Sequence, residues 1–344
     1  MATRVGSSIT IRDVARAAGV SRGAVSKVLC NAYGVSPEMK AKVQAVIDEL
    51  GYRPRISARG MRGSTYTLGV EIPNISNPFF PKIINGATAA LSGSRYQLII
   101  VPAGPDHDED AEAVQVLADR QVDGIVVISS KVPPAWLEDL AEQIPLVMLG
   151  RHDPSVSYDT VVGDDLLGAS LAVQHLYDLG HRRVVHLTQA QRGADALPGT
   201  PHGVRLTGYD EAVRILGLKS ETVMVEPDQA SARDGAMRLL SDLHEPVGIF
   251  AAFDELALGV LEAVGELGLR PAQASVVGYD DTEIASHPLM SLTSVNQSGT
   301  QMGAIAVRLL LERIAGRTEA VHEVITPRVM ARNSTAAPLA GRDT

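Results

Sequence analysis

The chain has 344 residues, of which 45% are hydrophobic, so it can bury the cores of two or three domains. It has no apolar run of about 18 residues, and its first ten residues lack the apolar core of a secretory signal, so neither membrane insertion nor export is expected. The single cysteine, Cys30, excludes an internal disulfide and a cysteine-based zinc site. These features predict a protein of the reducing cytoplasm.

The net charge of −9 conceals a basic N-terminal head on an acidic body. Residues 1–63 hold 11 Lys and Arg against 4 Asp and Glu, a charge of +7, whereas the rest of the chain holds 20 against 36, a charge of −16. This asymmetry predicts a polyanionic partner for the head alone. A basic, solvated tail without a partner is the alternative on charge alone.

Three short helices are predicted in the head, over residues 11–18, 22–29 and 37–50, because apolar residues recur there at helical spacing. Gly19 breaks the first pattern and Gly51 ends the third. Each helix follows a residue that can cap its N-terminus, namely Thr10, Ser21 and Ser36.

Two short helices joined by a tight turn and braced by a third match the helix-turn-helix arrangement. The second helix would then lie in the major groove of DNA with its N-terminal residues foremost. Arg22, Gly23 and Lys27 would face outward, and Arg22 can donate two hydrogen bonds to a guanine edge. A small three-helix domain with no role in DNA binding is the alternative.

The segment over residues 55–65 is basic and glycine-bearing, and it follows Pro54. By itself it is too short to form a stable helix. From these residues alone, a plain linker between domains and a segment that folds on DNA are equally well supported.

From Tyr66 onward, short apolar runs alternate with helical stretches, which predicts parallel sheets with crossover helices. About nine or ten such units exceed one usual sheet, so we expect an α/β body with two similar lobes. The strand candidates are residues 68–72, 97–101, 124–128, 146–149, 184–187, 222–225, 247–251 and 275–278.

Ligands of open parallel sheets bind beyond the carboxyl ends of the strands, so the side chains at those ends are candidates. Phe79 and Phe80 follow the first body strand and could stack on a sugar ring, or could instead belong to the core of a lobe. Asp254 and Asp280 follow two later strands, and each can accept two hydroxyl hydrogen bonds. Asp254 could also cap the helix that follows it.

The order and spacing of several motifs resemble those of the lac repressor (LacI/GalR) family. The stretch ITIRDVARAAGVS at residues 9–21 is similar to the head of that family, as are VSKVL at 25–29 and GYRP at 51–54. The resemblance covers nearly the whole chain, up to about Asn333.

The head also departs from the family pattern at three positions. Ala24 stands where threonine is usual, Lys27 where arginine is usual, and Cys30 where asparagine is usual. Lysine lacks the planar fork of arginine, so the operator sequence cannot be copied from a relative.

The resemblance implies how the head and the linker contact DNA. In the family the linker becomes a helix on DNA, pairs with its counterpart in the second subunit, and inserts an apolar side chain into the minor groove. Met61 holds that position here. Two heads on a homodimer would read two half-sites of operator double-stranded DNA. The implied DNA contacts are Thr10, Ser21, Arg22, Gly23, Ser26, Lys27, Asn31, Tyr52, Arg55, Ala58, Arg59 and Met61.

For the body, the resemblance implies the two-lobed fold of periplasmic sugar-binding proteins, with a small-molecule effector between the lobes. The chain would cross between the lobes near Val161, Val295 and Thr326. The implied division is a head over 1–54, a linker over 55–65, an N-lobe over about 66–161 and 296–326, a C-lobe over about 162–295 and 327–333, and a polar tail over 334–344.

The resemblance adds residues to the expected effector site. Arg205 matches an arginine that binds effector hydroxyls in the family, although a surface ion pair is its alternative role, and Gln297 matches a pocket residue. Phe253 replaces a common asparagine, which suggests a ligand with a larger apolar part. The predicted effector site comprises Phe79, Phe80, Asp164, Arg205, Phe253, Asp254, Asp280 and Gln297. The stretch over 188–203 could be a lid or merely a loose loop.

Recognisable catalytic motifs are absent from the sequence, which contains no P-loop, no His-Glu-x-x-His helix and no Gly-x-Ser-x-Gly turn. No cofactor or metal is expected, because the spacing of His175, His181 and His186 fits no helical metal pair. The predicted function is therefore a transcriptional repressor of the cytoplasm, associated with the nucleoid and controlled by a small-molecule effector that we expect to be a sugar. An exported sugar-binding protein and a sugar-modifying enzyme are the alternatives; the basic head argues against the first and the missing acid/base motif against the second.

Overall fold

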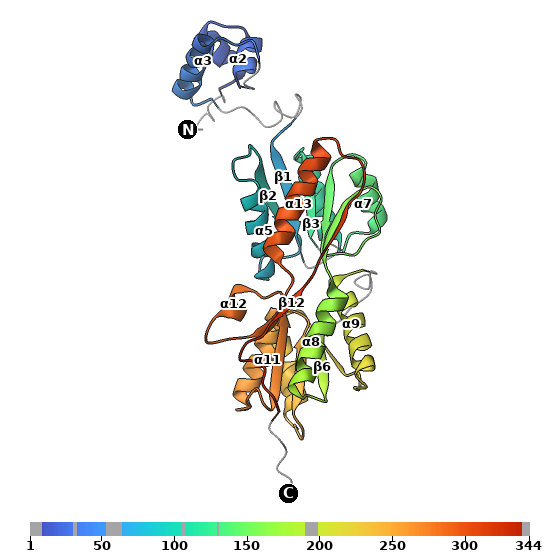
Figure 1. Cartoon of the computed structure of the whole chain (residues 1–344). Coiled ribbons are helices and arrows are strands. Elements are labelled where there is room, and N and C mark those ends of the chain that lie inside the picture. Colours follow the sequence, from blue (N-terminus) through green and yellow to red (C-terminus); the bar gives the residue numbers. More distant parts are fainter. Residues whose placement is uncertain are drawn as a thin grey trace. The chain divides into compact units, whose positions relative to one another are not determined.

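A computed structural model describes residues 9–29, 33–52, 64–104, 107–128, 131–189 and 199–338. These residues belong to two compact units, which divide after Thr65 (Figure 1). The first unit is the predicted head, and the second is the predicted α/β body.

The head contains α1 (Ile11–Ala18), α2 (Arg22–Leu29) and α3 (Pro37–Leu50), as expected from the sequence. Asp13 accepts hydrogen bonds from the hydroxyl and the backbone nitrogen of Thr10 at 2.7 and 2.9 Å, and these bonds lower the pKa of Asp13. The hydroxyls of Ser21 and Ser36 accept from the backbone at the starts of α2 and α3. The three helices share a small core of Val14, Ala15, Ala18, Val25, Val28, Val43, Ile47 and Tyr52.

The N-lobe of the body is a parallel sheet of six strands in the order β11-β5-β4-β3-β1-β2. Two helices, α5 (Phe79–Ala90) and α13 (Gly299–Ile314), pack on one face, while α6 (His107–Asp119) and α7 (Pro134–Ala141) pack on the other. The strands are β1 (Thr67–Ile72), β2 (Gln97–Pro102), β3 (Gly124–Ile128), β4 (Leu146–Leu149), β5 (Asp159–Gly163) and β11 (His322–Ile325).

Glycines allow α5 and α13 to pack at backbone contact. A Cβ atom on Gly86 would lie 1.9 Å from the carbonyl oxygen of Thr300, and one on Gly303 would lie 1.9 Å from that of Ile83. The two helices therefore form one rigid layer behind the N-lobe side of the cleft, to which α5 contributes Phe79 and Phe80.

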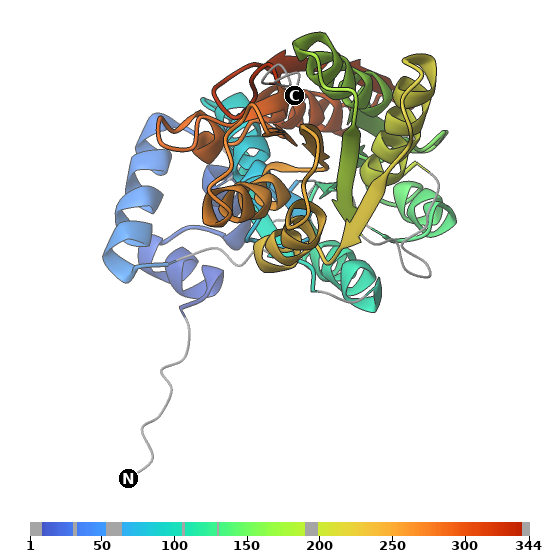
Figure 2. The same cartoon turned by 90° about the horizontal axis from the view of Figure 1, so that it is seen from below.

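The C-lobe repeats this plan with a sheet in the order β12-β10-β9-β8-β6-β7, in which only β12 runs antiparallel to its neighbour. Helices α8 (Asp165–Leu179) and α9 (Pro201–Ile215) pack on one face, and α10 (Gln229–Leu240) and α11 (Asp254–Glu266) on the other; Figure 2 shows helices around the outside of the sheets. The remaining elements are β6 (Val184–Gln189), β7 (Thr222–Val225), β8 (Val247–Ala251), β9 (Ala274–Tyr279), β10 (Thr293–Asn296), β12 (Arg328–Met330) and the short α12 (Glu283–Ser286).

Four strands were not predicted from the sequence: β5, β10, β11 and β12. They have five residues or fewer, and polar residues such as Asp159, Asn296 and Glu323 interrupt their apolar pattern. Long-range pairing forms them, since β5 lies between β4 and β11, and β10 lies between β9 and β12.

The chain passes between the lobes three times, after β5, after β10 and between β11 and β12 (Figure 1). The first passage follows Gly163, so Val161 still belongs to the N-lobe sheet. The second follows Asn296, one residue beyond Val295, and the third lies at residues 326–327.

The predicted polar tail requires a correction at its start. Ser334 is buried, and its hydroxyl accepts from the nitrogen of Thr293 at 2.7 Å and donates to the carbonyl of Val276 at 2.7 Å. Two residues later, the nitrogen of Ala336 donates to the hydroxyl of Ser275 at 3.0 Å. Residues 334–336 therefore belong to the C-lobe, because short polar side chains there complete the hydrogen bonds of β9 and β10.

Candidate functional site

The start of α2 forms the candidate DNA-binding surface of the head. Ser21, Arg22, Gly23 and Lys27 are exposed, and Ser26 is half-buried. Val25 and Val28 on the opposite side of α2 are buried in the head core, so packing fixes which side of the helix faces outward. The arrangement suits a helix that enters the major groove with its N-terminal turn first.

The other predicted DNA contacts have different positions. Thr10 is exposed at the start of α1. Tyr52 is only 8% exposed and packs in the head core, because it directly follows the Gly51 turn that ends α3, so its ring braces the head instead of presenting a free side chain. The remaining predicted contacts lie outside the described residues: Asn31, Arg55, Ala58, Arg59 and Met61.

A cavity of about 630 Å³ separates the two lobes of the body. Its wall is built largely from the residues that end or follow the parallel strands, as expected for open α/β sheets. Asn74 follows β1 and Lys131 follows β3 in the N-lobe, while Glu226, Phe253 and Asp280 follow β7, β8 and β9 in the C-lobe. The cavity volume is typical of pockets that bind a small organic molecule.

Six of the eight predicted effector residues line this cavity together: Phe79, Phe80, Arg205, Phe253, Asp280 and Gln297. The other two, Asp164 and Asp254, do not line it. The carboxylate of Asp164 caps α8 by accepting from the nitrogen of Leu167 at 3.0 Å. Asp254 is buried, and its carboxylate accepts hydrogen bonds from Ser294 and Thr282 at 2.6–2.7 Å, which ties α11 to β10 and to the segment that follows β9.

Arg205 is held rigidly at the C-lobe wall by groups around it. Its Nε donates to Asp165 Oδ1 at 2.8 Å, its Nη1 donates to the carbonyl of Ala252 at 2.8 Å, and its guanidinium lies 3.7 Å above the ring of Tyr279. The predicted alternative, a surface ion pair, is wrong because the Arg205 side chain is only 4% exposed. No described residue accepts a hydrogen bond from its Nη2, so that group is available to a ligand in the cavity.

Asp165 connects this arginine to the opposite lobe. Its second oxygen, Oδ2, pairs with Nε2 of His152 at 2.9 Å, and His152 lies on the loop that follows β4 of the N-lobe. Burial by itself raises the pKa of a carboxyl, but Arg205 and His152 together hold the pKa of Asp165 below its ordinary value. Asp165 therefore stays ionised inside the protein.

Asp280 and Gln297 form the adjoining part of the wall, where β9 and β10 end. The amide nitrogen of Gln297 donates to Asp280 Oδ1 at 2.5 Å. Burial raises the pKa of Asp280 to about 8, against the opposing effect of Arg205. Asp280 and Asp281 also have positive φ angles of 103° and 50°, which non-glycine residues rarely adopt. Asp280 thus lines the cleft from a turn with an uncommon backbone conformation.

Several cavity residues were missed by the sequence analysis. Lys131, Gln189 and Glu226 lie at or just after strand ends, so the strand-end rule would have found them had it been applied to every strand. His202 and Glu255 lie on α9 and α11, and only the way these helices pack brings them to the cavity. The acidic lining residues Asp110, Glu226, Glu255 and Asp280 outnumber the basic ones, Lys131 and Arg205.

The three histidines considered for metal binding have separate roles. His175 bonds to Thr335, His181 to Ser275, and His186 to the carbonyl of Phe250, at 2.8–3.0 Å. Within the described ranges, no group of three or more His, Cys, Asp or Glu side chains is arranged to hold a metal ion. The stretch over 188–203, considered as a lid, lies mostly outside the described residues.

None of the helices in the described part of the chain combines the length and the apolar character needed to cross a bilayer.

Comparisons with known proteins agree with this architecture. Residues 10–55 match the model for bacterial regulatory proteins of the lacI family, and residues 173–335 match the model for a periplasmic binding protein-like domain. The ribose operon repressor of Escherichia coli is 31% identical over 333 residues, which cover 94% of this chain and 99% of that protein.

Solved structures of transcriptional regulators are also similar to this chain over nearly its whole length. A complex of the transcriptional regulator CelR with cellobiose is 31% identical, covers 95% of this chain and 99% of its own, and has a TM-score of 0.68. The lac repressor dimer bound to operator has a TM-score of 0.82 over 96% of this chain and 100% of that chain, and at 24% identity it shows the fold alone. The chain is therefore a member of the lacI family of bacterial regulatory proteins, a DNA-binding transcriptional regulator rather than an enzyme.

Proposed function

We propose that this regulator is a cytoplasmic repressor that binds a pseudo-palindromic operator as a homodimer and is controlled by a sugar in the interlobe cleft. The observation that carries the proposal is the pairing of two features in one chain. A capped helix-turn-helix exposes Arg22 and Lys27, and a separate two-lobed body encloses a cavity of about 630 Å³ lined by both polar and apolar side chains. The effector acts through its different affinity for the DNA-competent and DNA-incompetent states.

The lining of the cleft supports a sugar as the effector. Arg205, Asp280 and Gln297 offer donors and acceptors for hydroxyl groups, and Phe79, Phe80 and Phe253 offer apolar faces for a ring. The excess of carboxylates over cations disfavours phosphorylated or acidic sugars. The ribose operon repressor and the CelR–cellobiose complex are relatives whose names include a sugar.

Operator binding is expected to depend on Arg22 and on salt. In the full-length protein, Arg22→Ala should weaken binding to a palindrome near the gene by about tenfold to a hundredfold, because a bidentate contact to guanine contributes about 1–3 kcal/mol. The measurement is fluorescence anisotropy at several salt concentrations, where log K should fall linearly with log salt.

The matched control is Lys219→Ala, which removes the same charge from an exposed position on the body. We expect this variant to bind like the wild type. Equal losses in both variants, or operator binding that is independent of salt, would contradict DNA recognition by α2.

Dimer formation is expected to use the exposed edge of the N-lobe. Strand β2 is at the end of the sheet, its Ile100 is 43% exposed, and a groove of about 490 Å³ beside it is lined by Ile84, Leu91, Tyr96 and Leu98. A second copy of the chain would cover these apolar side chains. Ile100→Glu should shift the mass measured by light scattering from dimer to monomer, whereas Ile215→Glu, at an exposed position on α9, should not. A monomeric wild-type protein at micromolar concentration would contradict the dimer.

A further inference from the structure

The start of α9 places two polar side chains without partners at the cavity wall. Thr200 precedes α9 and His202 lies in its first turn, and both line the cleft. Thr200 Oγ1 and His202 Nδ1 are buried and have no hydrogen-bond partner among the described residues. Buried polar atoms are nearly always hydrogen-bonded in native proteins, so this wall lacks the groups that would satisfy it.

The protonation state of His202 determines what it offers to the cavity. Burial, together with the nearby Arg205, lowers the pKa of His202 to about 3, so the imidazole is neutral and carries one ring proton. His202 Nδ1 is buried and has no hydrogen-bond partner in the described ranges. Because a buried N–H group without an acceptor is rarer than a buried acceptor without a donor, we place the ring proton on Nε2 and leave Nδ1 as the acceptor. Nε2 has no partner among the described residues and is not one of the buried orphan atoms, so it reaches the cavity as a hydrogen-bond donor.

An aromatic ring adjoins these two groups. The ring centroids of His202 and Phe253 are 5.5 Å apart and the rings are tilted by 57°. Phe253 lines the cleft from the end of β8, opposite the N-lobe residues Phe79 and Phe80. A ring face next to a hydroxyl and an N–H donor is the combination that binds a sugar ring.

Thr200, His202 and Phe253 share no hydrogen bond with the group around Arg205 in the described part of the chain. Gln297 donates to Asp280, and Arg205 donates to the carbonyl of Ala252 directly after β8. Together these three residues already provide both donors and acceptors for the hydroxyls of one sugar ring. A ligand that contacts only this group leaves Thr200 Oγ1 and His202 Nδ1 without partners among the residues that the structure describes. The cavity volume of about 630 Å³ accommodates a longer ligand.

We propose that Thr200, His202 and Phe253 form a second carbohydrate subsite beside Arg205, Asp280 and Gln297, so that the effector is an uncharged disaccharide rather than a monosaccharide. This inference rests on the proposed sugar-binding function of the cleft, and it adds the size of the ligand and the residues that select it.

The first test compares sugars by ring number with the purified full-length protein. Thermal shift and titration calorimetry would use glucose, galactose, xylose and ribose, together with cellobiose, maltose, lactose and xylobiose. We expect at least one disaccharide to bind at least tenfold more tightly than each of its component monosaccharides. A monosaccharide that binds as tightly as every disaccharide containing it overturns the second subsite but leaves sugar sensing intact. Failure of all eight sugars to bind overturns the sugar-binding function, and the second subsite with it.

The second test asks whether His202 accounts for the tighter binding of the disaccharide. His202→Phe keeps a ring against Phe253 but removes the N–H donor, so the best disaccharide should bind about fivefold to tenfold more weakly, as expected for one lost hydrogen bond. Binding of the component monosaccharide, where measurable, should not change. Thr200→Val removes the neighbouring hydroxyl and should act in the same direction, while Thr207→Val, at an exposed position on the same helix, is the matched control.

Operator binding and the melting temperature without sugar show that each variant is folded. Equal weakening of monosaccharide and disaccharide by His202→Phe would overturn the assignment, because it would place His202 in the first subsite. Unchanged disaccharide binding by both His202→Phe and Thr200→Val would overturn it as well.

Discussion

Replacing Arg205 with methionine is expected to destabilise the body by about 3–5 kcal/mol and to abolish the response to the effector. Methionine fills a similar volume, so the loss comes from the charge and not from a cavity. Asp165 would remain buried without its main cation, and the carbonyl of Ala252 would lose its donor. Urea unfolding followed by circular dichroism measures the loss of stability, and calorimetry with the best-binding sugar measures the response.

The double variant Arg205→Met with Asp165→Asn distinguishes this mechanism from simple misfolding. Removing both charges eliminates the buried, unpaired carboxylate, so the double variant should be more stable than Arg205→Met alone. It should still fail to bind the effector, because the Nη2 donor at the cavity is gone. A double variant that is less stable than the single one, or a single variant that still binds the effector with wild-type affinity, would contradict the role assigned to Arg205.

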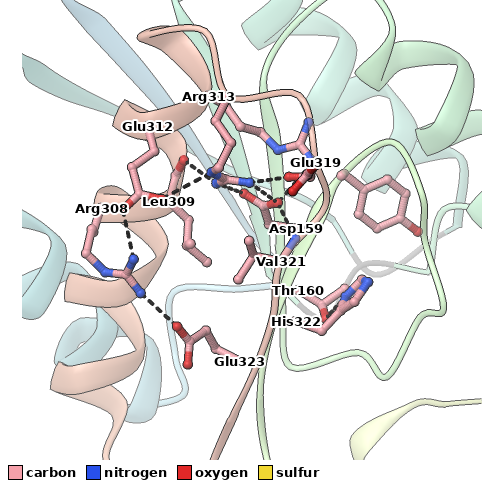
Figure 3. Close-up of polar contacts among 12 residues, drawn as sticks. Asp159, Thr160, Arg308, Leu309, Glu312, Arg313, Glu319, Val321, His322 and Glu323 are labelled. Atoms are coloured by element: carbon pink, nitrogen blue, oxygen red, sulfur yellow. Dashed lines mark hydrogen bonds and ion pairs between the residues drawn. The ribbon is translucent and has the colours of Figure 1, made fainter.

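Asp159→Asn is expected to lower the stability of the N-lobe by about 3 kcal/mol, because a buried carboxylate there is paired with two arginines. Asp159 Oδ2 lies 2.6 Å from Nη2 of Arg317, and Oδ1 lies 3.0 Å from Nη2 of Arg313 and accepts from the nitrogen of Val321 at 2.9 Å. Figure 3 shows how Asp159 thereby joins β5 to the end of α13 and to the segment that leads into β11.

The pH dependence of this loss follows from the direction of the pKa shift. Burial would raise the pKa of Asp159, but Arg317, Arg313 and the nitrogen of Val321 together hold it below the ordinary value of 3.8. A lowered pKa in the folded state stabilises the protein above pH 3.8, and this stabilisation is lost as the pH falls through that value toward the folded pKa. The difference in unfolding free energy between wild type and Asp159→Asn should therefore be constant from pH 7 to about pH 5 and shrink at lower pH.

An exposed ion pair nearby provides the control. Glu323 Oε1 lies 2.8 Å from Nη2 of Arg308, and both side chains are at least 40% exposed (Figure 3). Glu323→Gln should change the stability by less than about 0.5 kcal/mol at any pH, because solvent screens the pair. A difference between wild type and Asp159→Asn that grows as the pH falls would show that Asp159 does not stabilise the fold through its charge.

Local sequence signals were sufficient to predict the head. Thr10, Ser21 and Ser36 cap the helices they precede, and Gly19 and Gly51 have the positive φ angles that end α1 and α3. These interactions span only three or four residues, so the pattern of the chain contains them. Tyr52 is the exception, since whether it faces DNA or the core depends on how α3 packs against the other helices.

In the body, the sequence by itself determined the apolar strands, the two-lobed α/β plan and the strand-end residues of the cleft, because burial on both faces of a parallel sheet leaves continuous apolar runs. Only the tertiary structure decided that Asp254 and Asp164 are used in internal hydrogen bonds, while His202 and Glu255 reach the cavity. It also decided that β5, β10, β11 and β12 are strands. The physical reason is the same in each case: the partners of these residues are distant in the chain, and a polar side chain takes its role from whichever partner packing brings within hydrogen-bond distance.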